Sequence, residues 1–572
     1  DSRDRTPTRI AGGMRGEVGG RREDGSVYIV LDRDADGVIA VLLDDRGVED
    51  GRERVADLAD FVDACEPDRP RWTWDHTATW LPELLEAGVR IERAHDLRLV
   101  RAILRASLLT QNTPIASSPD GPLDVPLERT AEPADLDPPI ARTELFTMAA
   151  EPAPPADAAP SVDPVAELQL QLRSIRESAD PARLGLLAAA ESAGALIAVE
   201  MRFAGLPWSV TEHRRVLTEI LGPEPAAGQR PAVLAELHTR IEAALDGATV
   251  NPDSATDLKK VLQRSGLRIE TTSSWELREI DHPVIEPLLD YRKRSRIHTA
   301  NGWAWLQRWV RNGRFRPIYV PAGVVTGRWA SDGGGALQLP HQLRSAVRAD
   351  PGWALVVADA AQLEPRILAA MAGDEAMIAA GSSGDLYNGL VATGVVETRD
   401  QAKVAMLSAM YGGTTGDGGR LLPRLARAYP KAIAMVDAAA REGERGERVR
   451  TWLGRTSPLG QRDAPQQQAR AWGRFTRNFI VQGTAAEWAL CWMGGIRGRL
   501  AAEFDGPFPE AVPHLVFFLH DEVIVHTPIE DAERVAEIVQ EAARDAGRLL
   551  FGARPAVFPL SCVIVQDYAS AK

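Results

Sequence analysis

Two segments that join an apolar run to carboxylates lie 162 residues apart, and they constrain the fold more than any other feature of the chain. Residues 357–366 read as an apolar strand that ends at Asp359 and continues into a helix. Residues 517–526 read as two apolar strands joined by a tight turn that carries His520, Asp521 and Glu522. Paired aspartates at strand ends suit two divalent cations. The sequence therefore predicts that these distant segments meet in space.

A helix with a basic face that ends in a tyrosine is expected between the two segments. Arg399, Lys403, Leu407 and Tyr411 recur every four residues, so that they share one broad helix face. The stripe spans about 18 Å at a rise of about 1.5 Å per residue, long enough to lie along a nucleoside triphosphate. Basic groups suit the phosphates, and the ring suits the sugar and base.

Each motif has an ordinary structural explanation when it is taken alone. Asp359 could cap the following helix, Asp521 could be a turn residue, and the basic stripe could be a solvated helix face. The three motifs nevertheless occur in order, in strand–helix, helix and hairpin contexts, which is much less expected by chance. Together they predict a nucleotidyl-transfer site.

Charge is unevenly distributed along a chain whose formal net charge is −14. Residues 291–349 carry eleven lysines and arginines against one acid, which indicates local contacts with phosphates. Residues 113–165 hold ten acids, two arginines and twelve prolines, and a flexible linker is expected there. A chain of 572 residues exceeds one hydrophobic core, so we expect about three or four structural units.

Cysteine usage and hydropathy indicate where such a chain works. The three cysteines, Cys65, Cys491 and Cys562, are widely spaced, form no metal pattern and predict a reducing, cytoplasmic setting. No apolar run approaches the roughly 20 residues of a membrane helix, and no signal peptide is apparent, so no membrane partner is expected. The first residue is Asp1 rather than Met, which predicts a processed or trimmed chain.

As a set, the motifs resemble those of the family A DNA polymerases, the bacterial DNA polymerase I type. Further matches are the TGR segment at 326–328, the helix RFTRNFIVQGTAAE at 474–487, and NPDS at 251–254. The catalytic and metal-binding residues that the resemblance implies are Asp359, Asp521, Glu522 and Lys403, with the backbone carbonyl of Ala360. The implied dNTP-binding residues are Gln362, Glu364, Tyr387, Arg399, Lys403, Leu407 and Tyr411. The implied DNA-binding residues are Asn251, Arg292, Arg296, Arg328, Arg344, Arg474, Asn478, Gln482 and His520.

The resemblance implies an α+β, multidomain fold. A right-hand polymerase with palm, fingers and thumb would follow a ribonuclease H-like 3′–5′ exonuclease-type α/β domain. The implied divisions are a degenerate exonuclease-like domain at 1–112 with a return helix at 163–180, a disordered Pro/Asp/Ala-rich insertion at 113–162, the start of the palm and the thumb at 185–300, palm at 301–372, fingers at 373–489, and palm again at 490–572.

The resemblance also implies a reaction and its partners. The 3′-hydroxyl of a primer would attack the α-phosphate of a dNTP, with two Mg²⁺ ions (or Mn²⁺) bridged by Asp359 and Asp521. Glu364 would block a ribose 2′-hydroxyl. The partners would be primer–template DNA and dNTPs, acting on a monomer associated with the nucleoid in DNA replication or repair.

Several residues depart from the family pattern. Leu407 stands where an aromatic ring commonly stacks on the incoming base, Ala360 replaces the tyrosine after the first aspartate, Pro365 replaces a leucine, and Tyr387 replaces a histidine near the triphosphate. None of these changes removes a metal ligand. They predict weaker dNTP binding than in the standard family.

The first unit resembles the middle of a 3′–5′ proofreading domain, at residues 72–76, 84–89 and 94–96. Its opening strands contain no Asp-x-Glu, for which Asp32-Arg33-Asp34 is the nearest substitute, and Asp163 would approach the last metal aspartate. We therefore expect this domain to be inactive. The resemblance is closest to a short subgroup called bifunctional exonuclease/polymerase, which lacks the 5′-nuclease domain.

Three alternatives remain open. A single-subunit RNA polymerase shares the palm motifs, but Glu364 disfavours it. A non-catalytic DNA-binding paralogue is disfavoured by Asp359, Asp521 and Lys403. A polymerase with a working 3′–5′ exonuclease would differ only in the first unit.

Overall fold

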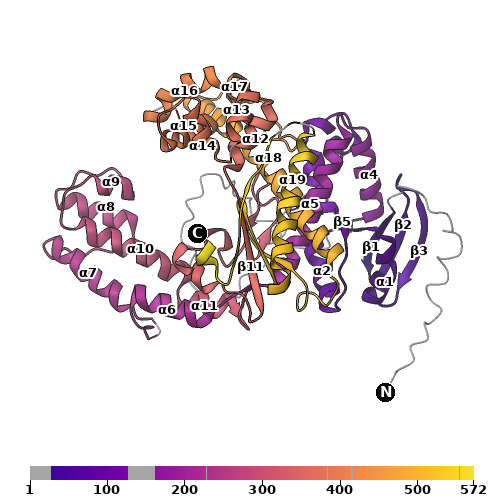
Figure 1. Ribbon diagram of the computed structural model, residues 1–572, viewed down its shortest axis with the longest axis horizontal. Coiled ribbons are helices and arrows are strands. Elements are labelled where there is room, and N and C mark those ends of the chain that lie inside the picture. Colours follow the sequence, from indigo (N-terminus) through magenta and orange to yellow (C-terminus); the bar gives the residue numbers. More distant parts are fainter. Residues whose placement is uncertain are drawn as a thin grey trace.

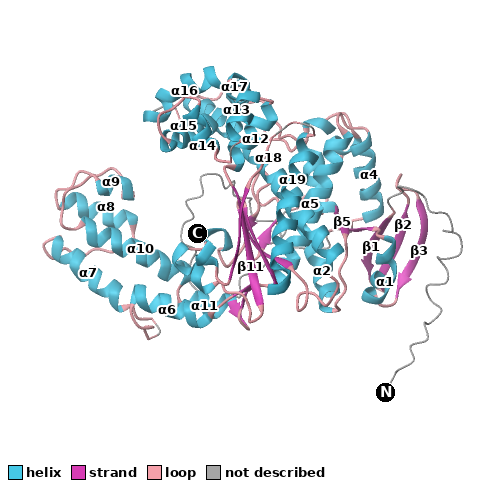
Figure 2. Cartoon of the chain, viewed as in Figure 1, coloured by secondary structure: helices cyan, strands magenta, loops and turns pink. Residues whose placement is uncertain are grey.

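The computed structural model of the chain describes residues 27–125, 162–226, 228–382, 384–413, 416–552, 554 and 556–571. An antiparallel sheet lies at the centre, with two helical lobes on one side and above it, and a separate α/β unit on the other side (Figures 1 and 2). The α+β, multidomain architecture that the sequence predicts is therefore confirmed.

The central sheet brings together strands from distant parts of the chain. Its order is β12-β13-β11-β14, and all neighbouring strands are antiparallel. The strands are β11 (Trp353–Ala360), β12 (His514–Leu519), β13 (Glu522–Pro528) and β14 (Leu560–Val565). Three long helices pack against this sheet and against one another, namely α5 (Pro181–Ala204), α18 (Gln466–Glu503) and α19 (Ala532–Phe551). β11 and β13 are almost wholly buried, which accounts for their apolar sequences.

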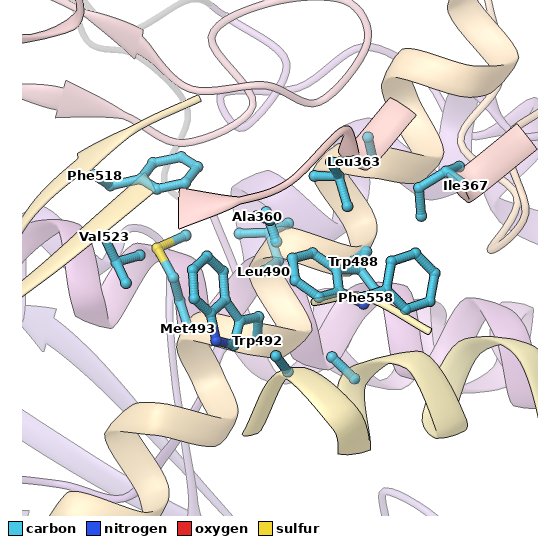
Figure 3. Close-up of a cluster of buried hydrophobic side chains, with 14 of the residues drawn as sticks. Ala360, Leu363, Ile367, Trp488, Leu490, Trp492, Met493, Phe518, Val523 and Phe558 are labelled. Carbon is cyan, nitrogen blue, oxygen red and sulfur yellow. The ribbon is translucent and has the colours of Figure 1, made fainter. Parts of the chain in front are cut away.

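A cluster of large aromatic side chains supports the end of β11 (Figure 3). The rings of Trp488 and Trp492 on α18 are fully buried and lie 5.3 Å apart, and Phe558 lies 5.2 Å from Trp488. Ala360, at the end of β11, and Leu363, at the start of α12 (Leu363–Ala372), belong to the same core. The strand end that carries Asp359 therefore rests on a densely packed base.

The α/β unit near the start of the chain has its own five-stranded sheet. The strand order is β3-β2-β1-β4-β5, with β1 antiparallel to β2 and parallel to β4. Its strands are β1 (Tyr28–Asp34), β2 (Gly37–Leu43), β3 (Glu49–Val55), β4 (Arg71–Trp74) and β5 (Arg93–Asp96). Its helices are α1 (Leu58–Cys65), α2 (Thr77–Glu86), α3 (Leu97–Ala106) and α4 (Pro164–Arg176), with short 3-10 turns η2 (Glu66–Asp68), η3 (Leu108–Thr110) and η4 (Pro114–Ser117).

Two helical lobes project from the central sheet (Figure 1). The first has a separate hydrophobic core and consists of α6 (Val210–Leu221), α7 (Ala232–Ala244), α8 (Ala255–Arg264), α9 (Ser274–Arg278) and α10 (Ile285–Asn301). The second follows α12 and consists of α13 (Glu375–Gly381), α14 (Leu386–Ala392), α15 (Arg399–Tyr411), α16 (Gly416–Ala428) and α17 (Pro430–Glu444).

Short elements connect the lobes to the sheet. They are α11 (Trp303–Trp309), β6 (Leu206–Pro207), β7 (Val310–Arg311), β8 (Arg314–Phe315), β9 (Tyr319–Val320), β10 (Ala330–Ser331), η5 (Ala336–Gln338), η6 (His341–Ala346), η7 (Ile529–Asp531) and η8 (Tyr568–Ala571). Residues 316–318 separate β8 from β9 and belong to neither strand.

Two sequence expectations need correction. The linker expected from residue 113 onward does not begin there, because Ile115 is fully buried and Arg101 forms ion pairs with Asp124 and Glu167. Residues 126–161 of that linker lie outside the described residues. The expectation that no apolar run approaches membrane-helix length is also wrong, because α5 is long and apolar enough by length and composition. Its apolar window is 72% buried inside the protein, as expected of a core helix.

Candidate active site

The two acidic segments meet at one end of the central sheet. β11 and β13 pair in a register that places Asp359 opposite Glu522, and the backbone N–H of Ala360 donates to the carbonyl oxygen of Asp521 at 2.9 Å. Burial and the neighbouring Asp359 raise the pKa of Asp521 to about 6. Two carboxylates thus lie close enough to repel each other, an arrangement that a cation or a shared proton relieves.

The hairpin turn between β12 and β13 presents these acids. Its two connecting residues are His520 and Asp521, and His520 adopts a positive φ of 60°. Two-residue hairpin loops favour turns with a positive φ at the first position, since the backbone twist then matches that of the strands. Burial and the nearby Arg328 lower the pKa of His520, which favours a neutral ring.

Glu522 points inward and contacts a residue from the far end of the described chain. Only 2% of Glu522 is exposed, and one of its carboxylate oxygens accepts a hydrogen bond from the Tyr568 hydroxyl. Burial and the charges of Glu522 and Asp359 raise the pKa of Tyr568, so that its hydroxyl remains a donor. The guanidinium of Arg344 lies 4.4 Å from the centre of the Tyr568 ring.

Glu364, in the first turn of α12, is held by two partners. Its carboxylate forms an ion pair with Arg328 and accepts a hydrogen bond from the Tyr411 hydroxyl at 2.9 Å. Burial and this carboxylate raise the pKa of Tyr411 to about 12. The carboxylate that is expected to exclude a 2′-hydroxyl is therefore fixed in place before any ligand binds.

The turn between β11 and α12 depends on a strained residue. Gln362 has a φ of 51°, and its side-chain oxygen accepts from the backbone N–H of Leu386 at 3.0 Å and from Arg366. Gln362 therefore links the strand end to α14. Pro365 lies within the first turn of α12, where its missing N–H is tolerated.

The basic face of α15 is exposed, as its spacing predicts. Ala402, Ala405, Met406, Ala409 and Met410 form the buried side of the helix. Arg399, Lys403, Leu407 and Tyr411 lie on the opposite, exposed side. Thr398 caps the start of the helix, and Gly412 ends it with a φ of 74°.

Arg399 already has partners within the protein. Its guanidinium forms an ion pair with Asp385 at 3.0 Å and lies 5.5 Å from the centre of the Tyr387 ring. Asp385 is not among the residues that the sequence predicts for the site. Its only sequence signal is that of an N-cap before α14, a role that it also fills through the backbone N–H of Asn388.

The predicted DNA-binding residues fall into two groups. Gln482 and Arg474 of α18 lie near α15. Gln482 forms a side-chain hydrogen bond with Tyr411, and a Cβ atom placed on Gly412 would lie only 2.7 Å from the Cγ atom of Arg474. The side-chain oxygen of Asn478 is buried and has no hydrogen-bond donor among the described residues. Arg328 and His520 also line the site. Asn251, Arg292 and Arg296 instead belong to the α6–α10 lobe.

A cavity of about 90 Å³ opens beside the acids. Arg328, Glu364, His520 and Asp521 form its polar side. Its apolar wall comes from α12, α18 and the central sheet, including Leu363, Leu490, Met493 and Phe518. The carboxylates therefore border a partly apolar recess.

Asp359 and Asp521 are the candidate metal ligands of this site. Within the described residues, no group of three or more His, Cys, Asp or Glu side chains is arranged to hold a metal ion. Mg²⁺ commonly uses one or two protein carboxylates and completes its shell with water and substrate phosphates. The pair formed by Asp359 and Asp521 fits that mode.

The acids of the α/β unit are close together but already engaged. Burial raises the pKa of Asp32, and Asp163, Asp34 and Asp75 act in the same direction. Asp34 forms a bidentate ion pair with Arg54, with both N–O distances 2.9 Å. Asp75 accepts a hydrogen bond from the indole N–H of Trp80 at 2.8 Å. Asp163 caps α4. Asp96 accepts from Thr77 and caps α3.

The chain is similar to known DNA polymerases in sequence. A family model described as DNA polymerase family A matches residues 228–553, more than half of the chain. Thermostable DNA polymerase I of Thermus thermophilus is 26% identical over 421 residues, covering 64% of this chain and 49% of the relative. DNA polymerase I of Chloroflexus aurantiacus is 28% identical over 328 residues, covering 52% and 33%. The matched part of the chain thus spans 49% of the length of the Thermus protein and 33% of the length of the Chloroflexus protein.

A solved structure resembles the whole chain in fold. It is described as the POL domain of Pol1 from M. smegmatis in complex with DNA primer-template and dNTP. The TM-score is 0.65 at 16% identity, and the match covers 99% of both chains. The similarity therefore includes the α/β unit and both helical lobes.

Proposed function

The chain belongs to DNA polymerase family A, and we propose that it is a template-directed DNA polymerase that adds dNTPs to a primer 3′-hydroxyl. The observation that carries this proposal is the meeting of Asp359 and Asp521 at the end of the central sheet, with Tyr411 of α15 hydrogen-bonded to Glu364 at the start of α12. Bound DNA primer-template and dNTP in the solved relative support the same partners here.

Metal binding is proposed at the paired aspartates. The raised pKa of Asp521 reflects a buried acid beside a second acid, which a hard divalent cation would compensate. Asp359, Asp521 and the carbonyl of Ala360 would hold two Mg²⁺ ions. Bound there, Mg²⁺ would lower the pKa of the primer hydroxyl and neutralise charge on the leaving pyrophosphate.

The remaining side chains bind and orient the substrates. We propose that Lys403 and Arg399 bind the triphosphate, for which Arg399 would exchange its ion pair with Asp385. Tyr411 and Arg328 hold Glu364 where it would meet a ribose 2′-hydroxyl. Arg474, Asn478 and Gln482 would contact template and primer. The side-chain oxygen of Asn478, which has no hydrogen-bond donor in the described part of the chain, suits such a contact.

The lobes acquire roles under this proposal. The central sheet with α5, α18 and α19 would be the palm, α6–α10 the thumb, and α13–α17 the fingers. Arg292 and Arg296 on α10 would contact the phosphates of duplex DNA from the thumb. We also infer that the protein acts as a monomer on chromosomal DNA in the cytoplasm.

A primer-extension assay tests the activity. With Mg²⁺ and all four dNTPs, the protein should extend a labelled primer on a longer template, and Asp521→Ala should abolish extension. The variant should bind primer–template within about threefold of the parent, because the acid contacts metal rather than DNA. If the parent chain binds DNA but extends nothing, it is a non-catalytic paralogue.

For the α/β unit we propose the absence of 3′–5′ exonuclease activity. Asp34, Asp75, Asp96 and Asp163 each have a hydrogen-bonding role within the fold, and the described residues hold no three-acid metal group. Incubating a 3′-labelled primer–template with Mg²⁺ and no dNTPs should leave the primer intact. Shortening of the primer that persists in Asp521→Ala would overturn this proposal.

A further inference from the structure

Tyr568 lies just after β14 and carries its side chain into the active site. The residue has no exposed surface, and its hydroxyl donates to the carboxylate of Glu522. Glu522 follows Asp521 in the chain and faces Asp359 across the β11–β13 pair. One phenol thus contacts the carboxylate group on which the proposed reaction depends.

The Tyr568 ring is held on several sides. The Arg344 guanidinium lies 4.4 Å from its centre, and the Phe517 ring meets it edge-on at 6.0 Å. The backbone N–H of Tyr568 donates to Val347 at 3.0 Å, and that of Ala349 donates to Gln566 at 2.9 Å. The ring cannot swing away from Glu522 without breaking these contacts.

We propose that Tyr568 is a positioning residue for the nucleotidyl-transfer site, an inference that rests on the proposed function. Its hydroxyl holds the Glu522 carboxylate in one orientation beside Asp359 and Asp521. A hydrogen bond to a charged acceptor is stronger than one between neutral groups, so it can restrain a carboxylate that its neighbours repel. The ring also holds the Arg344 guanidinium at the same edge of the site.

Tyr568→Phe isolates the hydroxyl, because the ring and its packing remain. We expect kcat for primer extension to fall by at least about tenfold, the range that loss of a charge-assisted hydrogen bond supplies. The KM for dNTP and the Kd for primer–template should stay within about twofold, since Tyr568 has no exposed surface with which to contact either one. The Mg²⁺ concentration for half-maximal rate should rise.

Tyr429→Phe provides the matched control. Tyr429 is equally buried, and its hydroxyl lies 3.2 Å from the side-chain oxygen of Thr393 in the α13–α17 lobe. Both variants lose one buried hydroxyl and should lose comparable thermal stability. Only Tyr568→Phe should change the Mg²⁺ dependence, because a purely structural role would not alter it.

A double-mutant cycle tests whether Tyr568 acts through Glu522. In a Glu522→Gln background, Tyr568→Phe should cause less than about a twofold further loss of kcat, since the two groups form one unit. Wild-type kcat and Mg²⁺ dependence in Tyr568→Phe, or fully multiplicative losses in the double variant, would overturn the inference.

A measurement without turnover separates this inference from the proposed function. Mg²⁺ alone should raise the Tm of the parent chain, and the rise should be smaller in Tyr568→Phe than in Tyr429→Phe. If the parent chain failed to extend primers, this comparison would still decide the positioning role. Equal Mg²⁺-dependent rises in both variants would refute it.

Discussion

Folding places the Asp521 carboxylate in a buried position beside a second acid, Asp359. Its pKa of about 6 means that the folded chain binds a proton that the unfolded chain releases near the ordinary aspartate value of 3.8. The stability that this group contributes therefore falls as the pH rises from about 4 to about 6, and it stays low above that range. Ionisation of this buried acid therefore lowers the free energy of unfolding by on the order of a few kcal/mol.

Magnesium should remove this cost. We expect Mg²⁺ to raise the Tm more at about pH 7.5, where Asp521 is ionised, than at about pH 5, where a proton occupies the pair. Thermal denaturation with Mg²⁺ or with EDTA at both pH values measures the effect. Asp521→Asn should abolish the difference between the two pH values, and a larger rise at the lower pH would contradict the assignment.

Glu364 depends on the partners that hold it. Tyr411→Phe removes one of its two hydrogen-bonding contacts, so the carboxylate should gain freedom to move aside for a 2′-hydroxyl. We expect incorporation of rNTPs relative to dNTPs to rise by about tenfold, as loss of one charge-assisted hydrogen bond would allow. Single-nucleotide extension with each substrate measures the ratio. An unchanged ratio would show that Arg328 alone fixes Glu364.

At the scale of elements, the spacing of residues in α15 was enough to predict its exposed face. The four-residue repeat of Arg399, Lys403, Leu407 and Tyr411 defines one side of a helix whatever lies around it. The partners of that face could not be predicted, because Asp385 reaches Arg399 only through the packing of α14 on α15. Tyr568 was missed for a similar reason, since its partner lies 46 residues away in the sequence.

Leu407 is the residue on this face that differs from the family pattern, and a binding experiment can test its effect. It is 37% exposed, so a larger side chain can be accommodated without repacking the core. Leu407→Tyr should lower the KM for dNTP by about fivefold or more, because stacking of a base on an aromatic ring contributes about 1–3 kcal/mol. Val404, 45% exposed on the same helix, provides a control, and Val404→Tyr should leave the KM unchanged.

At the scale of the whole molecule, a buried ion pair joins the α/β unit to the central sheet. Arg497 of α18 pairs with Glu200 of α5 at 2.7 Å and also donates to the backbone carbonyl oxygens of Ile91 and Glu92. Both charged side chains are only 7% exposed. One guanidinium therefore connects three segments that are distant in the sequence.

Breaking this connection should destabilise the protein without changing its chemistry. Arg497→Ala leaves Glu200 buried without its main partner, and we expect a loss of about 3–5 kcal/mol in the free energy of unfolding. The kcat should be retained, because the pair lies outside the proposed site. Arg499, on the same helix as Arg497, forms a partly exposed pair with Asp545 of α19, and Arg499→Ala should cost less than about 1 kcal/mol. Denaturant unfolding compares the two.

The sequence predicted the mixed architecture and the meeting of the two acidic strands, but the expected start of the linker was wrong. Composition alone marked residues 113–125 as flexible, although Arg101 draws Asp124 and Glu167 together and Ile115 enters the core. Proline and acid content describes an isolated segment and carries no information about a buried arginine elsewhere. The apolar length of α5 likewise becomes interpretable only when its covering helices are known.

The pairing of Asp359 with Glu522 has a consequence for sequence divergence among relatives. Side chains alternate between the two faces of a strand, so inserting or deleting one residue within β11 would turn Asp359 to the opposite face. Length changes should therefore be absent from β11 and from the two-residue turn before β13, while the connections on the lobes can lengthen freely. A set of related sequences in which single-residue gaps fall inside β11 while both acids are kept would be incompatible with this geometry.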